Sequence, residues 1–131
     1  MQNLYSDSVY QRIQEYGIIP LVTLENARDA LLLGQALMEC GLPIVEITFR
    51  TKAAEEAIKI LKKEYPEILV GAGTVLTKAT AKIAIQAGAE FILSPGIYPE
   101  VIQYCQDRNV LPFPGCMTPT DLELAQRLGL K

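Results

Sequence analysis

Apolar and polar side chains alternate strictly along residues 45–50. The apolar positions are Val45, Ile47 and Phe49, and the polar positions are Glu46, Thr48 and Arg50. Because successive side chains of a strand point to opposite faces, this pattern predicts a strand with one face for packing and the other for chemistry. Helical patterns on both sides favour a parallel sheet, whose buried strands are normally hydrophobic throughout.

A carboxylate on such a strand requires a charged partner or a wet cavity, because burying it alone costs several kcal/mol or more. Glu46 is that carboxylate. Two further interpretations remain open. The segment could be an edge strand with a solvated polar face, or Glu46 and Arg50 could form a buried pair that serves stability alone.

The rest of the chain repeats short apolar segments, each followed by an amphipathic helical pattern. Strands are expected at 18–22, 44–50, 68–70, 91–93 and 110–113, and helices at 8–16, 26–40, 52–65, 78–87, 99–107 and 119–129. Thr51, Thr77 and Thr118 are expected to cap three of these helices, the last in a capping box with Asp121. Leu130 and Lys131 would open a sixth strand. The alternation predicts a single α/β domain over residues 1–131, with a parallel sheet and right-handed crossovers.

Two architectures fit this order of elements. A (β/α)8 barrel typically needs about 200 residues or more, so the chain would supply five of its eight units. A doubly wound sheet of five strands would be complete at this length. A receiver domain would carry acidic residues after the first and third strands, where the chain has Val22-Thr23 and Gly71-Ala72-Gly73. These glycines form neither a dinucleotide fingerprint nor a P-loop.

Composition excludes several classes of partner. A net charge of -3 with scattered lysines argues against nucleic acid. The apolar runs are far shorter than the roughly 20 residues of a membrane span, so no membrane partner is expected. The first seven residues lack the pattern of a signal peptide, and three cysteines without Cys-x-x-Cys spacing indicate reduced thiols. We therefore expect a cytoplasmic protein.

The absence of histidine narrows the chemistry. Mechanisms that use an imidazole base, and most zinc sites, are excluded for a chain with no histidine. Acid–base work must then fall to carboxylates, lysine, tyrosine or water.

Chemistry-bearing residues gather where the expected strands end. They are Glu46, Thr48 and Arg50, then Gly73-Thr74, then Ser94-Pro95, then Gly115-Cys116. The carboxyl ends of the strands in βα folds are where sites assemble. A tight turn after the strand is the alternative interpretation of the glycines at 71 and 73.

Motifs around these positions together resemble a known family. They are Val45-Glu46-Ile47-Thr48-Phe49-Arg50, Val70-Gly71-Ala72-Gly73-Thr74-Val75, Gly88-Ala89-Glu90-Phe91, Ser94-Pro95-Gly96, Pro114-Gly115 and Met117-Thr118-Pro119-Thr120. In order and spacing, from Ile18 onward, the chain resembles the 2-keto-3-deoxy-6-phosphogluconate aldolases and their 4-hydroxy-2-oxoglutarate aldolase relatives.

The resemblance implies a homotrimeric (β/α)8 TIM barrel, of which this chain covers about the first five βα units and the start of strand six. It implies a class I lyase that cleaves a 2-keto-3-deoxy(-6-phospho) sugar acid or 4-hydroxy-2-oxoglutarate to pyruvate and an aldehyde through a lysine Schiff base. Glu46 would be the general acid/base, Arg50 would bind the pyruvate carboxylate, Thr74 would share that carboxylate, and Pro95 would line the pocket. No metal or organic cofactor is called for.

The chain departs from the family pattern in one respect. The Schiff-base lysine of the family lies on strand six, about five residues after the glycine that ends the preceding helix. Counted from Gly129, that position falls beyond Lys131. The alternatives to an aldolase are therefore a catalytically inactive truncated or half-barrel fragment that acts as a folding or association module, and a five-stranded binding domain complete in itself.

Overall fold

A computed structural model describes the backbone of residues 4–130 and the side chains of residues 8–130. Helices and strands alternate along this part of the chain. The strands are β1 (Leu21–Val22), β2 (Ile44–Thr48), β3 (Leu69–Gly73), β4 (Phe91–Ser94) and β5 (Leu111–Pro114). The helices are α1 (Leu4–Tyr16), α2 (Asp29–Glu39), α3 (Ala54–Glu64), α4 (Lys78–Ala87), α5 (Pro99–Gln106) and α6 (Pro119–Arg127).

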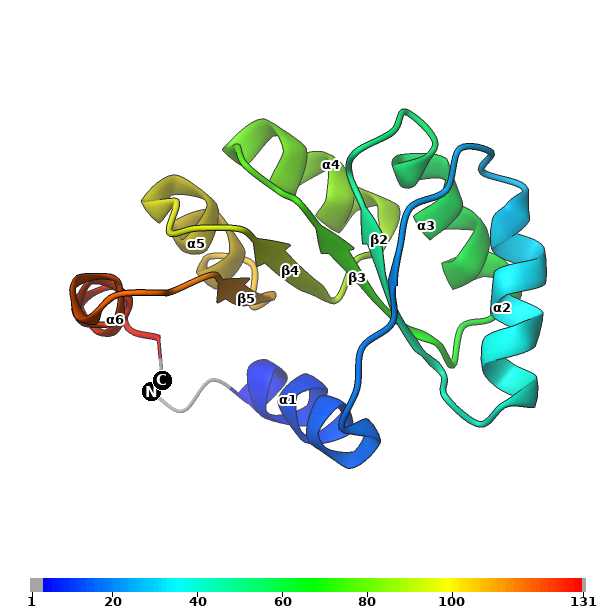
Figure 1. Ribbon diagram of the computed structural model, residues 1–131, viewed down its shortest axis with the longest axis horizontal. Helices are drawn as coiled ribbons and strands as arrows, with labels where there is room; N and C mark the ends of the chain where they lie inside the picture. Colours follow the sequence, from blue (N-terminus) through cyan, green and yellow to red (C-terminus); the bar gives the residue numbers. More distant parts are fainter. Residues whose placement is uncertain (1–3, 131) are drawn as a thin grey trace.

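The five strands form one parallel sheet in the order β1-β2-β3-β4-β5. A doubly wound sheet reverses its strand order at a switch point, and this order contains no reversal. Because every right-handed crossover proceeds in the same direction, the connecting helices lie on one side of the sheet. Figure 1 shows α2 to α5 in an arc on that side. The prediction of a TIM-barrel fold is confirmed, with the first five βα units present as an open part of the barrel.

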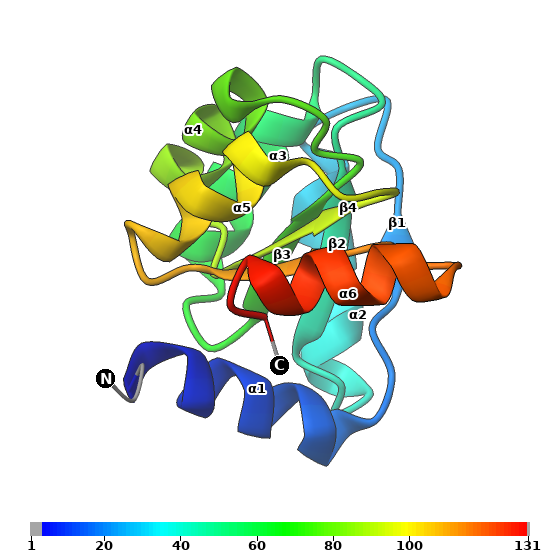
Figure 2. The same cartoon turned by 90° about the vertical axis from the view of Figure 1, so that its left-hand side faces the viewer.

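The two faces of the sheet pack against different helices. Its outer face, with Val45, Ile47 and Val70, joins the apolar sides of the surrounding helices in one continuous core. Its inner face, with Ile44, Leu69 and Phe91, packs against α1 near the starts of the strands. Figure 2 shows α1 below the strands. The other end of the inner face, where the strands finish, is therefore the end available for a site.

Several expected elements have shorter or shifted bounds. The strand expected at 18–22 is reduced to β1, whose Leu21 is 55% exposed, because it lies at the edge of the sheet. The strand expected at 44–50 ends at Thr48. The caps at Thr77 and Thr118, including the reciprocal bond with Asp121, are confirmed. The cap expected at Thr51 is wrong, because α3 begins only after Ala53 and no side chain caps it. Leu130 lies in no strand, and Lys131 lies outside the described residues.

A lysine–glutamate pair joins the starts of β3 and β4. Lys62 Nζ donates to Glu90 Oε2 over 2.7 Å, to the Ile68 carbonyl over 3.1 Å and to the Pro66 carbonyl over 3.3 Å. Glu90 Oε2 also accepts from the Val70 amide. The two side chains thus neutralise each other's charge. They also form hydrogen bonds with backbone groups before and within β3.

Replacement of Lys62 by methionine is expected to lower the free energy of unfolding by about 1–2 kcal/mol, because bonds to charged, largely buried groups are lost together. The two side chains are only 23% and 32% exposed. Lys59, whose bond to Glu55 lies on the surface, offers a matched control, and Lys59→Met is expected to change stability much less. Urea unfolding of both variants measures the difference, and equal losses would contradict the role given to Lys62.

Candidate functional site

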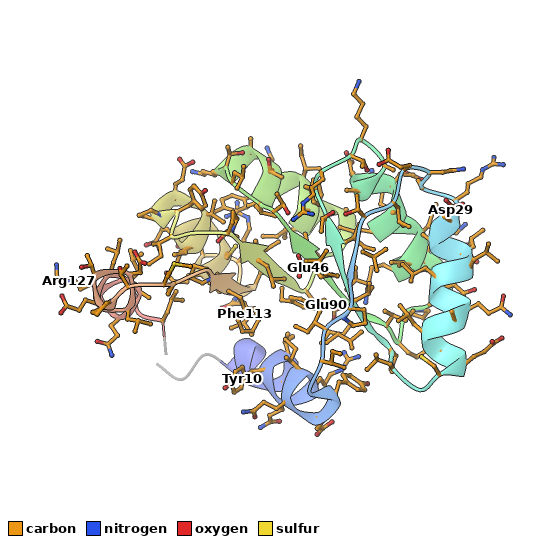
Figure 3. All side chains as sticks on the ribbon, viewed as in Figure 1. Tyr10, Asp29, Glu46, Glu90, Phe113 and Arg127 are labelled. Carbon is orange, nitrogen blue, oxygen red and sulfur yellow. The ribbon has the colours of Figure 1, made fainter. Side chains whose placement is uncertain are left out.

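Glu46 lies in the middle of β2, on the inner face of the sheet. Its neighbours in register are Leu21 of β1 and Gly71 of β3, and its side chain is 6% exposed. Figure 3 shows the labelled Glu46 beside the central strands. Burial raises the pKa of Glu46, and the positive charge of Arg50 opposes this rise. A carboxyl group in this position can exchange protons nearer neutral pH than an ordinary glutamate.

Neither alternative interpretation of Glu46 agrees with this geometry. β2 has a neighbouring strand on each side, so it is not an edge strand. Arg50 follows the end of β2 and is exposed, and no ion pair joins it to Glu46 within 4.0 Å among the described side chains. Within residues 8–130, no side chain donates a hydrogen bond to the Glu46 carboxylate. The Glu46 side chain is thus largely buried, and its carboxylate, which has no hydrogen-bond partner among these residues, keeps contact with solvent.

Thr74 follows β3 with an unusual backbone. Its φ is 58°, in the left-handed region that β-branched residues rarely adopt. Hydrogen bonds hold both neighbours: Phe49 donates its amide to the Gly73 carbonyl over 2.8 Å, and Val75 donates to the Leu93 carbonyl over 3.1 Å. Such strain persists where the surrounding structure enforces it, and it clusters at functional sites.

Two replacements of Thr74 separate its backbone strain from its side chain. Alanine keeps the strained φ, whereas glycine adopts it freely, at an entropic cost of roughly 0.5–1 kcal/mol. We expect Thr74→Gly to exceed Thr74→Ala in free energy of unfolding by up to about 1 kcal/mol. Denaturant titration of the two variants provides the comparison. A Thr74→Ala protein that is the more stable of the two would show that the left-handed backbone is not strained.

A pair of hydroxyl groups lies beside Glu46, and one of its two members, Thr23, was missed by the sequence analysis. Thr48 is fully buried on the same face of β2, and its Oγ1 lies 2.7 Å from Oγ1 of Thr23, just after β1. The pairing register of β1 and β2 is the signal that could have identified Thr23. Val22 pairs with Ile47, so the next residue of each strand falls side by side.

Pro95 follows β4 and is exposed. The end of β4 is joined to the end of β5 by a hydrogen bond from the Gly115 amide to the Ser94 carbonyl, of 2.8 Å, and the Ser94 hydroxyl donates to the Gly96 carbonyl. Glu46 within β2, Arg50 after β2, Thr74 after β3 and Pro95 after β4 thus lie at or near the carboxyl ends of consecutive strands. Glu46 and Arg50 interact electrostatically, while Pro95 lies two strands from them.

Other surface features do not compete with this edge of the sheet. A hollow between α2 and α3, lined among others by Arg28, Leu31 and Lys59, contains none of the four candidates. In the described part of the chain no three acidic or cysteine side chains come together as a metal site. Among residues 4–130 no helix combines the length and apolar character needed to cross a bilayer.

Comparison with known proteins places these residues in context. Residues 9–131 match the family model described as KDPG and KHG aldolase. The 2-dehydro-3-deoxy-phosphogluconate aldolase of Haemophilus influenzae is 38% identical over 125 residues, which are 95% of this chain and 59% of that protein. The chain therefore spans less than two thirds of the length of this curated relative.

Solved structures agree with the sequence comparison. The 2-keto-3-deoxy-6-phosphogluconate aldolase of Zymomonas mobilis with 3-phosphoglycerate superposes with a TM-score of 0.86 at 35% identity, covering 93% of this chain and 58% of that one. The KDPG aldolase of Legionella pneumophila, with pyruvate captured as a covalent carbinolamine intermediate, gives a TM-score of 0.80 at 33% identity. It covers 85% of this chain and 54% of that one.

Proposed function

The chain belongs to the KDPG and KHG aldolase family, and from this premise we propose that it supplies the first five βα units of a class I aldolase. We refer to the whole barrel as the complete aldolase. Its proposed reaction is cleavage of a 2-keto-3-deoxy(-6-phospho) sugar acid, or of 4-hydroxy-2-oxoglutarate, to pyruvate and an aldehyde. The observation that carries the proposal is the largely buried Glu46 side chain, whose carboxyl group has a raised pKa and no hydrogen-bond partner among the side chains of residues 8–130.

Schiff-base chemistry explains why such a carboxyl group is needed. A lysine amine condenses with the substrate ketone and releases water, and the resulting iminium accepts the electron pair of the breaking carbon–carbon bond. The hydroxyl proton next to that bond must pass to a base as the aldehyde forms, and the enamine that remains must receive a proton before pyruvate is released. Glu46 accepts the first proton and returns one in the second step.

The other candidates take binding roles in this proposal. The Arg50 guanidinium presents parallel N–H donors that match a planar carboxylate. Thr74 adds a hydroxyl donor to the same carboxylate, and Pro95 forms an apolar wall. The nucleophilic lysine is assigned to strand six, beyond Lys131. Family membership also supports a homotrimeric, cytoplasmic complete aldolase, and analytical ultracentrifugation tests the trimer.

Trapping the imine tests the proposed function. The complete aldolase is treated with borohydride in the presence of pyruvate, and its intact mass is measured before and after. We expect a reduced pyruvyl adduct on a lysine beyond Lys131, and no adduct on residues 1–131 treated alone. An untrappable complete protein would contradict the aldolase and favour the inactive association module. An adduct on a lysine within residues 1–131 would contradict the assignment of the nucleophile.

A further inference from the structure

Gly73, the last residue of β3, leaves open the space that the Glu46 carboxyl group occupies. A Cβ atom built on Gly73 would overlap Oε1 of Glu46, and it would lie 2.5 Å from Cδ and 2.8 Å from Cγ of that side chain. Real Cβ atoms essentially never approach other heavy atoms within 3.0 Å. A side chain at position 73 and the carboxyl group at its present position therefore exclude one another.

The backbone at Gly73 cannot move aside easily. Gly73 pairs in register with Thr48, and its carbonyl accepts the Phe49 amide over 2.8 Å. The next residue, Thr74, has a φ of 58°. Because Gly73 is fixed by β2 on one side and by this turn on the other, the flexible Glu46 side chain is the part that would yield.

No polar contact holds the carboxyl group in place. The described side chains offer it no hydrogen bond, since the nearby hydroxyls of Thr48 and Thr23 pair with each other. On the inner face, β3 presents glycine at 71 and 73, and β4 presents the apolar Phe91 and Leu93. Arg50 is the charged group whose field reaches it. The position of the Glu46 carboxyl group is therefore set by the shape of the inner face of the sheet.

We propose that Gly73 is a positioning residue, which holds the Glu46 carboxyl group at its buried place on the inner face by leaving that place empty. The proposal rests on the function proposed for Glu46. It differs from the turn interpretation of the glycine, because the φ of Gly73 is not among the positive values of the chain. The backbone conformation of Gly73 does not itself require glycine, and the three atoms nearest to a Cβ built there all belong to Glu46.

The variant Gly73→Ala tests this proposal in the chain itself. We expect the carboxyl group to move toward solvent, so that the pKa of Glu46 falls toward that of an ordinary glutamate, as followed by a carboxyl-carbon NMR titration. In the complete aldolase, kcat should fall on the order of 100-fold, because small displacements of a reacting group have effects of this size. KM should change little, since Arg50 and Thr74 stay in place.

Gly34→Ala is the matched control. Gly34 is buried on α2, and a Cβ there would overlap the Tyr65 ring, away from the inner face. This variant should lose stability without any change in the pKa of Glu46. A folded Gly73→Ala protein whose Glu46 keeps the raised pKa would overturn the proposal.

A double-mutant comparison covers the case in which Gly73→Ala folds poorly. If the clash with Glu46 is the cause, Gly73→Ala should shift the urea midpoint much less in a Glu46→Ala background than in the parent protein. Equal shifts in both backgrounds would overturn the proposal. The function proposed for Glu46 is tested separately: if Glu46→Gln keeps full turnover while Gly73→Ala still lowers the pKa of Glu46, the positioning stands and the catalytic role fails.

Discussion

Replacement of Glu46 by glutamine is expected to lower kcat of the complete aldolase by about 10²–10⁴-fold, the usual contribution of a positioned general acid/base. Glutamine keeps the size of the side chain and can neither accept nor return the proton. Steady-state kinetics of keto-acid cleavage measure the loss. Glu67→Gln, which changes an exposed glutamate between α3 and β3, is the control and should leave kcat unchanged. Full turnover by the Glu46→Gln enzyme would remove Glu46 from its proposed role.

Glu46→Gln is expected to lower kcat and yet to raise the free energy of unfolding at neutral pH. Burial raises the pKa of Glu46 in the folded protein above its value in the unfolded chain, so the native state binds this proton more tightly. Stability is therefore lost as pH rises from the unfolded to the folded pKa. Glu46→Gln should be more stable than the parent chain at neutral pH, and the advantage should disappear below about pH 4. Urea titrations at several pH values test this, and a pH-independent difference would contradict the burial effect.

Replacement of Arg50 by methionine is expected to raise KM for the keto acid by roughly 10- to 100-fold, since hydrogen bonds to a charged group are worth about 1.5–3 kcal/mol. Arg50→Lys should give a smaller increase, because an ammonium keeps the charge and loses the paired donors. Arg28, an exposed arginine that lines the hollow between α2 and α3, provides the control, and its replacement by methionine should leave KM unchanged.

A second readout separates binding from electrostatics. The Arg50 charge lowers the pKa of Glu46, so Arg50→Met should raise that pKa further while Arg50→Lys leaves it close to the parent value. An NMR titration of the Glu46 carboxyl carbon measures both variants. An unchanged KM in Arg50→Met, together with a raised pKa of Glu46, would leave Arg50 a purely electrostatic role.

The local elements could be predicted from sequence because each has a local physical cause. The alternation of apolar and polar residues predicted β2. Thr77 and Thr118, whose hydroxyl groups accept a hydrogen bond from the amide three residues later, predicted the starts of α4 and α6. The order of the strands has no local cause, and only the resemblance indicated a barrel. β1 was predicted too long, because apolar residues such as Ile18 look alike in a pattern whether they are buried or, as here, 60% exposed.

The candidate site was predictable in its residue types and not in its geometry. Glu46 stood out because a carboxylate interrupts an apolar strand. The contact between Gly73 and Glu46 could not be predicted, because a glycine in a sequence shows only that a side chain is missing. It does not show which neighbouring side chain occupies the space. The left-handed backbone of Thr74 was also hidden, because threonine is a residue that normally avoids it.

The position of α1 has a practical consequence for attaching the protein to a support. This helix packs against the inner face where the strands begin, whereas Thr74 and Pro95 follow the carboxyl ends of β3 and β4. Its Gln11 and Gln14 are exposed, so a linker placed there would leave the strand ends turned toward solution and open to keto acids. Coupling through the exposed thiol of Cys116, just past β5, would instead press the same edge against the support.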